Sequence, residues 1–193
     1  MIQIGDNIYN SVTGTRFHIL AMSDSGFTIE QTVESGKKQS TLNHMHRTWT
    51  ENFEVISGTS KYTLEGKVSE IRAGDKFTVK PGQAHIHPWN TGNDDLHFTQ
   101  TDTFPTPDTT AAQDTFLAFS TTFALAGLGK ADHDGVPRNP LQLMATLDFF
   151  RQHGGYIPGV PLGLQDVLIG GGGALGRAFG YRGWYEQYLP NRK

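Results

Sequence analysis

Short runs in which apolar and polar residues alternate fill the first hundred positions of the chain. The clearest runs span residues 17–21, 27–33, 53–57, 61–64, 67–71, 76–80 and 96–101. Turn-forming residues separate them, as at Ser23-Asp24-Ser25-Gly26 and at Glu65-Gly66, where glycine can adopt a positive φ angle. Many short strands at a spacing of roughly 8–12 residues are typical of an all-β sandwich or barrel.

The pattern changes where prolines at positions 105 and 107 mark a linker. Asp108 or Thr109 can cap a helix that runs toward Ala126, and Asn139-Pro140 predicts the start of a second helix. We therefore predict a β-domain over residues 1–105 and a helical extension over residues 106–193. This extension is expected to pack on the barrel or on a partner subunit.

A third apolar stretch covers residues 162–179 and contains four consecutive glycines at 170–173. We expect these glycines to break the stretch, or else to allow close packing between helices. The part from 167 to 179 has Arg177 as its one basic residue, so packing against the barrel or a partner is favoured over a membrane surface.

Composition and charge narrow the classes of function. Hydrophobic residues make up 36% of the 193 positions, enough for a substantial core. The net charge of −3, without clusters of like charge, argues against nucleic-acid binding. The absence of cysteine excludes a disulfide framework and a thiolate metal site. With neither a signal peptide nor an apolar run of about 18 residues in view, we expect a cytoplasmic protein without a membrane span.

The first candidates for a functional site are two histidines with one residue between them. Side chains alternate between the faces of a strand, so His44 and His46 should point the same way. Glu51 lies at an odd offset from them, and a turn around residues 48–50 would return it to the same side. His85, which follows Pro81-Gly82, can supply a further group from another strand.

These positions resemble the two sequence motifs of the cupins. The residues that match the first motif are His44, His46, Glu51 and Gly58. The residues that resemble the second motif are Gly74, Pro81, Gly82, His85 and Asn90. The resemblance covers about residues 10–105. It implies a double-stranded β-helix, or jelly-roll barrel, followed here by the helical extension. It also implies a metal ion in the mouth of the barrel, with four ligands: His44, His46, Glu51 and His85.

The implied ligands restrict the metal. Neutral imidazole nitrogens and one carboxylate suit Fe, Mn, Ni, Co, Cu or Zn and disfavour all-oxygen calcium or magnesium sites. We expect one divalent transition metal per chain. Four protein ligands on a six-coordinate ion leave two open positions, whereas a tetrahedral zinc would be closed.

Other side chains are candidates for the surroundings of this site. His87 can replace His85 as a ligand or orient a substrate, although a histidine of the barrel rim fits the same pattern. His97 is a candidate general base or support for a ligand, against the simpler role of a hydrogen-bonded or exposed histidine. A substrate pocket would be lined by Trp49, Phe53, His87 and Trp89.

Several functions are compatible with such a site. The resemblance favours a metal-dependent enzyme acting on a small organic molecule, with a dioxygenase-type oxidoreductase using Fe(II) or Mn(II) as the leading hypothesis. A metal-dependent isomerase or lyase, a non-catalytic module that binds or senses a sugar or metabolite, and a structural zinc protein are the alternatives, because fold does not determine function. A homodimer is the expected assembly.

Overall fold

The computed structural model describes residues 1–37, 39–108, 110–132 and 134–190. Its strands are β1 (Asn7–Asn10), β2 (Thr15–Ser23), β3 (Gly26–Val33), β4 (Met45–His46), β5 (Thr50–Ser57), β6 (Thr59–Leu64), β7 (Lys67–Arg72), β8 (Lys76–Val79), β9 (His85–Asn90), β10 (Leu96–Thr103) and β11 (Gly155–Tyr156). Its helices are α1 (Ala111–Gly127), α2 (Pro140–Gln152), α3 (Leu162–Ala178) and the short 3-10 helix η1 (Glu186–Tyr188).

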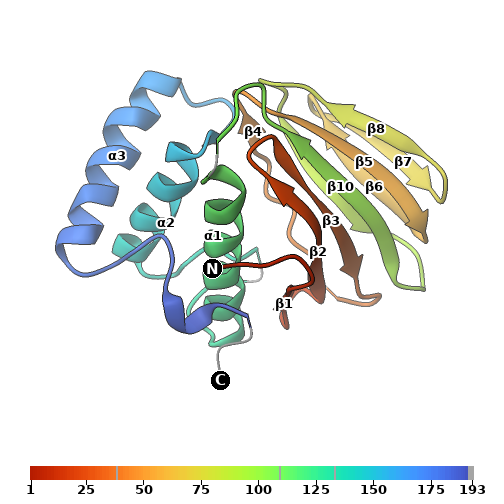
Figure 1. Ribbon diagram of the computed structural model, residues 1–193, viewed down its shortest axis with the longest axis horizontal. Helices are drawn as coiled ribbons and strands as arrows, with labels where there is room; N and C mark the ends of the chain where they lie inside the picture. Colours follow the sequence, from red (N-terminus) through yellow and green to blue (C-terminus); the bar gives the residue numbers. More distant parts are fainter. Residues whose placement is uncertain (38, 109, 133, 191–193) are drawn as a thin grey trace.

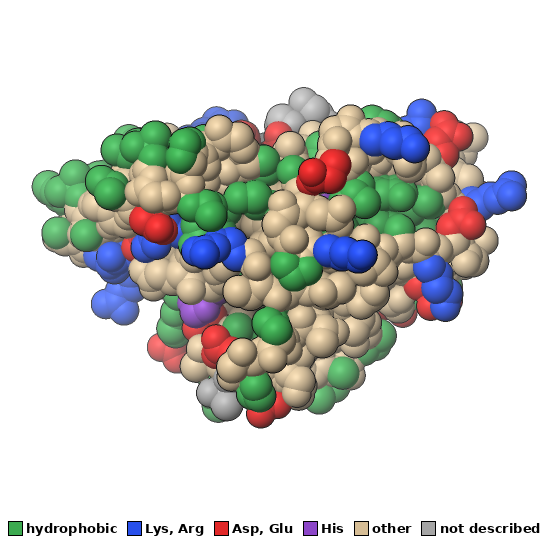
Figure 2. Space-filling model, turned by 90° about the horizontal axis from the view of Figure 1, so that it is seen from above, with side chains coloured by type: hydrophobic (Ala, Val, Ile, Leu, Met, Phe, Trp, Pro, Cys, Tyr) green, Lys and Arg blue, Asp and Glu red, His purple; other side chains and the backbone are tan. Residues whose placement is uncertain are grey.

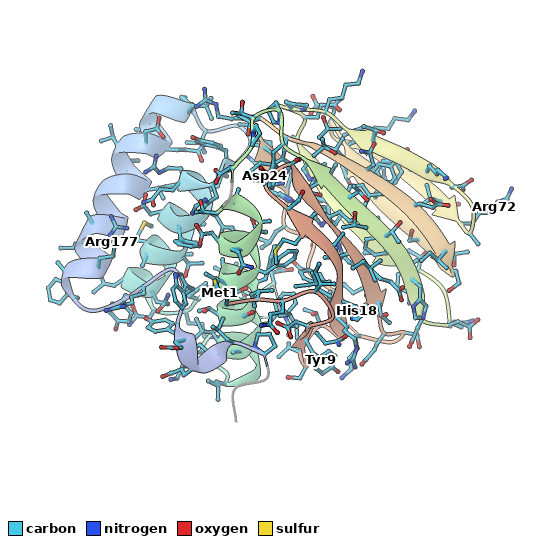
Figure 3. The ribbon with its side chains drawn as sticks, in the orientation of Figure 1. Met1, Tyr9, His18, Asp24, Arg72 and Arg177 are labelled. Carbon is cyan, nitrogen blue, oxygen red and sulfur yellow. The ribbon has the colours of Figure 1, made fainter. Side chains whose placement is uncertain are left out.

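The molecule is built in layers. The strands β1–β10 form one end, α1 lies against them, and α2 and α3 follow outward at the other end (Figure 1). Arg72 at the end of β7 and Arg177 on α3 lie at opposite ends of this arrangement (Figure 3). The layering places the outer strands of the β-region and the surface of α3 at opposite ends of the molecule.

Two antiparallel sheets carry most of the strands. Six strands pair in the order β1-β2-β3-β10-β5-β8, three in the order β7-β6-β9, and β4 pairs with β11. The hairpin between β6 and β7 turns at Glu65 and Gly66, whose φ angles are 51° and 76°, as its sequence predicted. The predicted double-stranded β-helix, followed by helices, is confirmed.

The inward-facing residues of β10 divide the interior into three zones. Leu96 and Phe98 belong to an apolar cluster between the two sheets, and Phe104 just beyond the strand belongs to a second cluster under α1. Between them along the same face lie Gln100 and Asp102, both buried. The two hydrophobic clusters therefore enclose a buried polar band, which is unusual because buried polar groups need partners.

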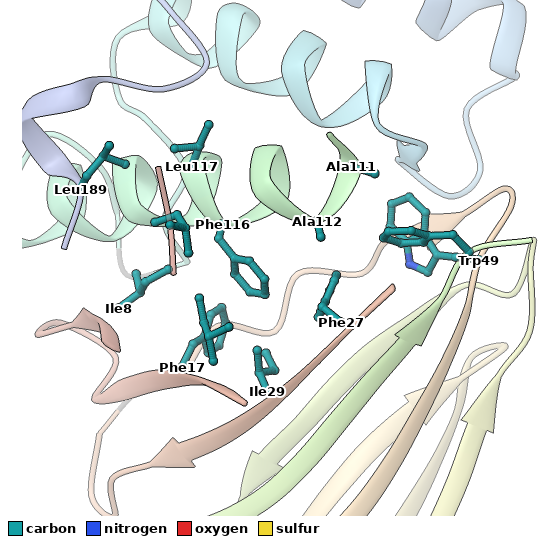
Figure 4. Packing of buried hydrophobic residues seen from close by; sticks show 13 residues of the cluster. Ile8, Phe17, Phe27, Ile29, Trp49, Ala111, Ala112, Phe116, Leu117 and Leu189 are labelled. Carbon is teal, nitrogen blue, oxygen red and sulfur yellow. The ribbon is translucent and has the colours of Figure 1, made fainter. Parts of the chain in front are cut away.

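The second cluster attaches the helices to the sheet. Phe116 of α1 points at Phe17, Phe27 and Ile29 of β2 and β3 (Figure 4), and its ring centroid lies 4.8 Å from that of Phe27. Burying aromatic side chains removes a large apolar area from water. The packing of α1 on the sheet thus follows from its apolar face, while the division at residue 105 stays a prediction.

The start of the second helix is as predicted, because Asn139 is its N-cap and accepts hydrogen bonds from the backbone N–H groups of Leu141 and Gln142. The N-cap of α1 is Thr110, which makes no side-chain cap bond, and not the predicted Asp108. Asp108 lies just before it and accepts hydrogen bonds from the backbone N–H groups of Thr110 and Ala111. The alternative cap at Thr109 lies outside the described residues. Among the residues that are described, no helix is both long and apolar enough to cross a membrane.

The expected break at residues 170–173 is wrong, because α3 runs unbroken through all four glycines. Close packing against α2 explains them. A Cβ atom on Gly173 would lie 2.3 Å from Cβ of Asp148, and one on Gly176 would lie 2.5 Å from the carbonyl oxygen of Leu141. Packing therefore overrides the low helix propensity of glycine.

Candidate metal centre

Two short strands and a bend bring the first motif together. His44 forms an isolated bridge with His85, in which each backbone N–H donates to the other's carbonyl at 3.0 and 2.9 Å. The chain bends at residues 47–48, and β5 then starts with Glu51 facing inward. The turn that the odd offset of Glu51 predicted is thus present, slightly earlier than expected.

Four side chains converge on one point. His44, His46, Glu51 and His85 each offer one ligand atom, and these atoms lie within 4.8 Å of one another. The Oε2 atom of Glu51 is 2.7 Å from Nε2 of His85, and its Oε1 atom is 3.3 Å from Nε2 of His46. Atoms bound to one ion at about 2.0–2.2 Å lie at most about 4.4 Å apart, so shifts of a few tenths of an ångström would bring all four atoms onto a common ion.

Backbone carbonyls orient two of the imidazoles. Nδ1 of His44 lies 3.1 Å from the carbonyl oxygen of Leu42, and Nδ1 of His85 lies 3.0 Å from that of Gln83. A carbonyl oxygen can only accept, so each Nδ1 must carry the proton. The Nε2 lone pairs of both rings are then directed at the cluster, as a metal-binding histidine requires.

The contact between Glu51 and His85 tests whether a metal fits. With Nδ1 protonated, Nε2 of neutral His85 is an acceptor, and so is the carboxylate oxygen 2.7 Å away. Both atoms are buried and have no hydrogen-bond partner among the described side chains. Two acceptors this close repel each other, so the contact needs either a second proton on His85 or a cation between the two atoms. A metal ion held by the four side chains can fill the second role, and the donor set fits one.

Burial sets the charge state of the other histidines. Removal from water lowers the pKa of His44 well below its usual range, and the neighbouring histidines lower it further. Burial also lowers the pKa of His46, although the charge of Glu51 opposes this. Both rings are therefore neutral at pH 7, which is the form that binds a metal.

Glu51 stays ionised in spite of its position. Burial by itself raises the pKa of Glu51, but electrostatic attraction to the imidazoles of His46 and His87 and hydrogen bonds from His46 and His85 hold it well below its usual range. Burial likewise lowers the pKa of His85, and the hydrogen bond with Glu51 reverses this into a net rise. Without a metal, the proton between the last two groups therefore resides on His85.

A chain of amides supports the carboxylate from behind. Nε2 of Gln100 donates to Oε1 of Glu51 at 3.1 Å and to Oδ1 of Asp102 at 2.8 Å, while Nε2 of Gln31 donates to the side-chain oxygen Oε1 of Gln100. Burial raises the pKa of Asp102 well above its usual range, and the charge of Glu51 adds to the rise. These residues form the buried polar band, and the sequence motifs gave no signal for them.

His87 joins the cluster, whereas His97 does not. Nε2 of His87 is buried without a hydrogen-bond partner among the described residues and lies 3.5 Å from Oε1 of Glu51. The side chain of His97 points to the other face of β10, where Nδ1 lies 3.2 Å from the hydroxyl of Thr32 and 3.8 Å from a carboxylate oxygen of Glu30. The role considered for His97 at the site therefore has no geometric support.

The proposed pocket residues surround the cluster unevenly. Trp49 is buried and stacks on His46, with ring centroids 4.1 Å apart. Phe53 is buried and contacts His87 edge to face at 5.1 Å. Trp89 is half-buried in β9, four residues beyond His85.

A separate hollow of about 520 Å³ lies between α2, α3 and residues 182–186, and it shares no residue with the cluster.

The helical region also reaches the histidine strand. Gly155 and Tyr156 of β11 pair with His46 and Met45 of β4. The backbone N–H of Arg47 donates to the carbonyl of Gly154 at 3.3 Å. The sequence predicted no strand at this position, because strands of two residues leave no periodic signal.

A model of the cupin domain family matches residues 29–102. This segment is a cupin domain. It contains all four converging side chains of the candidate metal centre, and the predicted family is confirmed. The helices lie beyond the match.

Known proteins share parts of the chain. A curated protein of Vibrio cholerae, named for mannose-1-phosphate guanylyltransferase, is 44% identical over 55 residues, which are 28% of this chain but only 11% of the length of that protein. Among solved structures, an uncharacterised double-stranded β-helix protein from Klebsiella pneumoniae is 21% identical with a TM-score of 0.42, covering 56% of this chain and 85% of its own. A predicted oxalate decarboxylase from Thermotoga maritima has the same identity and TM-score, covering 51% and 90%.

Proposed function

We propose that this cupin binds one divalent transition metal through His44, His46, Glu51 and His85 and uses it as an enzyme on a small organic molecule. The observation that carries the proposal is the convergence of these four side chains, whose ligand atoms lie within 4.8 Å of one another. A divalent cation bound among them would take the place of the proton that otherwise joins Nε2 of His85 to Oε2 of Glu51, 2.7 Å away. One carboxylate and three neutral imidazoles would leave a net charge of about +1 on a divalent ion.

The reaction class that this site supports best is that of a dioxygenase-type oxidoreductase. A bound Fe(II) or Mn(II) ion would supply Lewis acidity and redox chemistry at positions that the four ligands leave open. The protein would contribute the surroundings. His87 can donate from Nε2 to a substrate oxygen, since this atom is buried without a partner among the described groups, and Trp49 and Phe53 keep water from one side of the cluster.

The metal can be identified by elemental analysis of protein purified without added metal. We expect close to one transition metal ion per chain, and the absence of stoichiometric metal would refute the proposal. The reaction can then be tested by oxygen uptake on Fe(II)-loaded protein with a panel of diketones, flavonols and catechols.

The outcomes separate the candidate functions. Oxygen consumption coupled to loss of a substrate would support the dioxygenase. Conversion without oxygen would indicate an isomerase or lyase. A compound that binds and is recovered unchanged would indicate a binding or sensing module, and a tetrahedral zinc without exchangeable ligands would indicate a structural site.

A further inference from the structure

Helix α3 has two contrasting faces. One packs on α2 through glycines, as described above. The other carries large apolar side chains in the open, among which Val167 is 70% and Phe179 is 67% exposed. We call the exposed set the α3 stripe: Leu164, Val167, Leu168, Leu175 and Phe179. In the view from above, hydrophobic side chains gather at the end of the molecule where α3 lies (Figure 2).

The stripe follows one side of the helix. Its members are separated by three, one, seven and four residues, which keeps them within about half of the helix circumference at 3.6 residues per turn. The charged residues of α3 lie away from it, because Asp166 pairs with Arg151 at 2.8 Å and Arg177 pairs with Asp148. Both partners belong to α2, so the charges face that helix.

This charge distribution disfavours a membrane as the occupant. Helices that lie on membranes combine an apolar face with several flanking basic residues, which attract anionic lipids. Here the one basic side chain of the helix is held by a buried aspartate on α2. An apolar face without flanking charge is instead suited to another apolar face of the same kind.

We propose that the α3 stripe is a homodimer interface in which α3 packs antiparallel on α3 of a second copy of this chain, about a two-fold axis at Gly171. Leu168 and Leu175 lie three and four residues on either side of this glycine, so each would meet the other across the axis. Leu164 and Phe179 would meet in the same way at the ends. The stripe is thus complementary to itself.

Gly171 suits the crossing point. It is exposed, and a Cβ atom built on it would have no heavy atom within 4 Å, unlike the neighbouring glycines that face α2. Without a side chain at the centre, two helix backbones can approach closely and the flanking leucines can interlock.

The area reaches the lower limit for a specific pair. The exposed parts of the five side chains amount to roughly 500 Å² per protomer, so their complete burial in a two-fold pair would remove about 1,000 Å² from water. The interface would lie at the end of the molecule opposite the sheets (Figure 1) and contains no residue of the candidate metal centre. The proposal is therefore independent of the proposed function.

The test is the mass of the full-length protein in solution, measured by analytical ultracentrifugation across a range of concentrations. The wild type should sediment as a dimer of the 21.3 kDa chain. Leu168→Glu would place a charge in the contact and should weaken dimerisation at least about tenfold. Val68→Glu is the matched control, because Val68 is an exposed apolar residue on β7 at the far end. It should leave the dimer intact.

Cross-linking gives a second measurement. The chain has no cysteine, so Gly171→Cys introduces a single thiol that a two-fold axis would place opposite itself. Mild oxidation should convert this variant, and not Val68→Cys, into a disulfide-linked dimer. A monomeric wild type, a dimer unaffected by Leu168→Glu, or binding of a monomer to anionic phospholipid vesicles would each overturn the proposal.

Discussion

Nε2 of His85 and Oε2 of Glu51 lie 2.7 Å apart in a position closed to water. Glu51 has two properties that matter for binding a cation. It is the one negative charge among the four converging groups, and it touches His46 as well as His85. The affinity for a cation should therefore depend on its charge more than on its shape.

Glu51→Gln keeps the shape and removes the charge. We expect its metal content to fall below about one tenth of the wild-type value, since a ligand matters more than the supporting groups, whose loss typically costs 10–100-fold. The matched control is Glu54→Gln on the outer face of β5, where Glu54 pairs with Lys76 at 2.9 Å. Full metal content in Glu51→Gln would show that the ligands are assigned incorrectly.

Gln100 should act as a positioning residue for Glu51, because one amide nitrogen serves both Glu51 and Asp102. Gln100→Leu removes that donor and should weaken metal binding roughly 10–100-fold. Competition with a chromophoric chelator would measure the change. Thr99→Ala, a substitution on the other face of β10, should bind metal like the wild type, and equal affinities of both variants would contradict the role of Gln100.

The folded state of the metal-free protein holds a proton on Asp102 to higher pH than the unfolded chain does, since burial raises its pKa. The stability that this group contributes is therefore complete below its unfolded pKa and is lost as the pH rises through the folded pKa. Asp102→Asn mimics the neutral acid, so it should be more stable than the wild type at pH 8 by about 1–3 kcal/mol.

Urea unfolding at a series of pH values would test this expectation. The advantage of Asp102→Asn should vanish below about pH 4, where the wild-type carboxyl group is protonated in both states. Asp94→Asn, in the exposed turn before β10, serves as the control. A constant difference at every pH would assign the effect to packing instead.

Gly154 should control the histidine strand through Trp49. Its φ angle is +87°, and a Cβ atom on it would lie 2.9 Å from the ring of Trp49, which stacks on His46. Gly159 has a similar φ of +80° but open space around it. Gly154→Ala should therefore lose about 1–3 kcal/mol more stability than Gly159→Ala and should also bind metal more weakly. Equal losses in the two variants would mean that backbone strain alone is responsible.

Gly173 tests the packing of α3 on α2. An alanine inside a helix normally stabilises it by up to about 1 kcal/mol relative to glycine. At Gly173 the new methyl group would collide with Asp148, so Gly173→Ala should instead destabilise the protein by about 1–3 kcal/mol. Gly163→Ala meets no atom within 4 Å and should be nearly neutral in thermal unfolding. A stabilised Gly173→Ala variant would refute this packing.

Local patterns were sufficient to predict the first motif and the strands other than β1 and β11. His44 and His46 fall on one side because strand alternation is a property of the backbone, and the turn before Glu51 follows from its odd offset. The cap at Asn139 is equally local, since one side chain satisfies the N–H groups next to it.

Features that depend on contacts between distant segments could not be predicted. The sequence leaves two alternatives for the glycines of α3, a helix break or close packing between helices, and only the position of Asp148 on another helix decides for packing. Gln31, Gln100 and Asp102 each look like ordinary strand residues, and their connection to Glu51 exists only once three strands are paired. His97 is a candidate from the sequence because its strand can be predicted, whereas the side of the sheet to which its side chain points cannot.

The pairing of β4 with β11 has a consequence for how the site is made. A strand of two residues has no stability of its own. On one side this segment is held by the bridge between His44 and His85 and by the hydrogen bond from the backbone N–H of Gly82 to the carbonyl of His46, and on the other side by residues 155–156. During synthesis, the histidines at 44 and 46 therefore lack one of their two supports until more than a hundred further residues have emerged. The affinity for metal should therefore rise in a late step of folding, when residues 155–156 pair with β4.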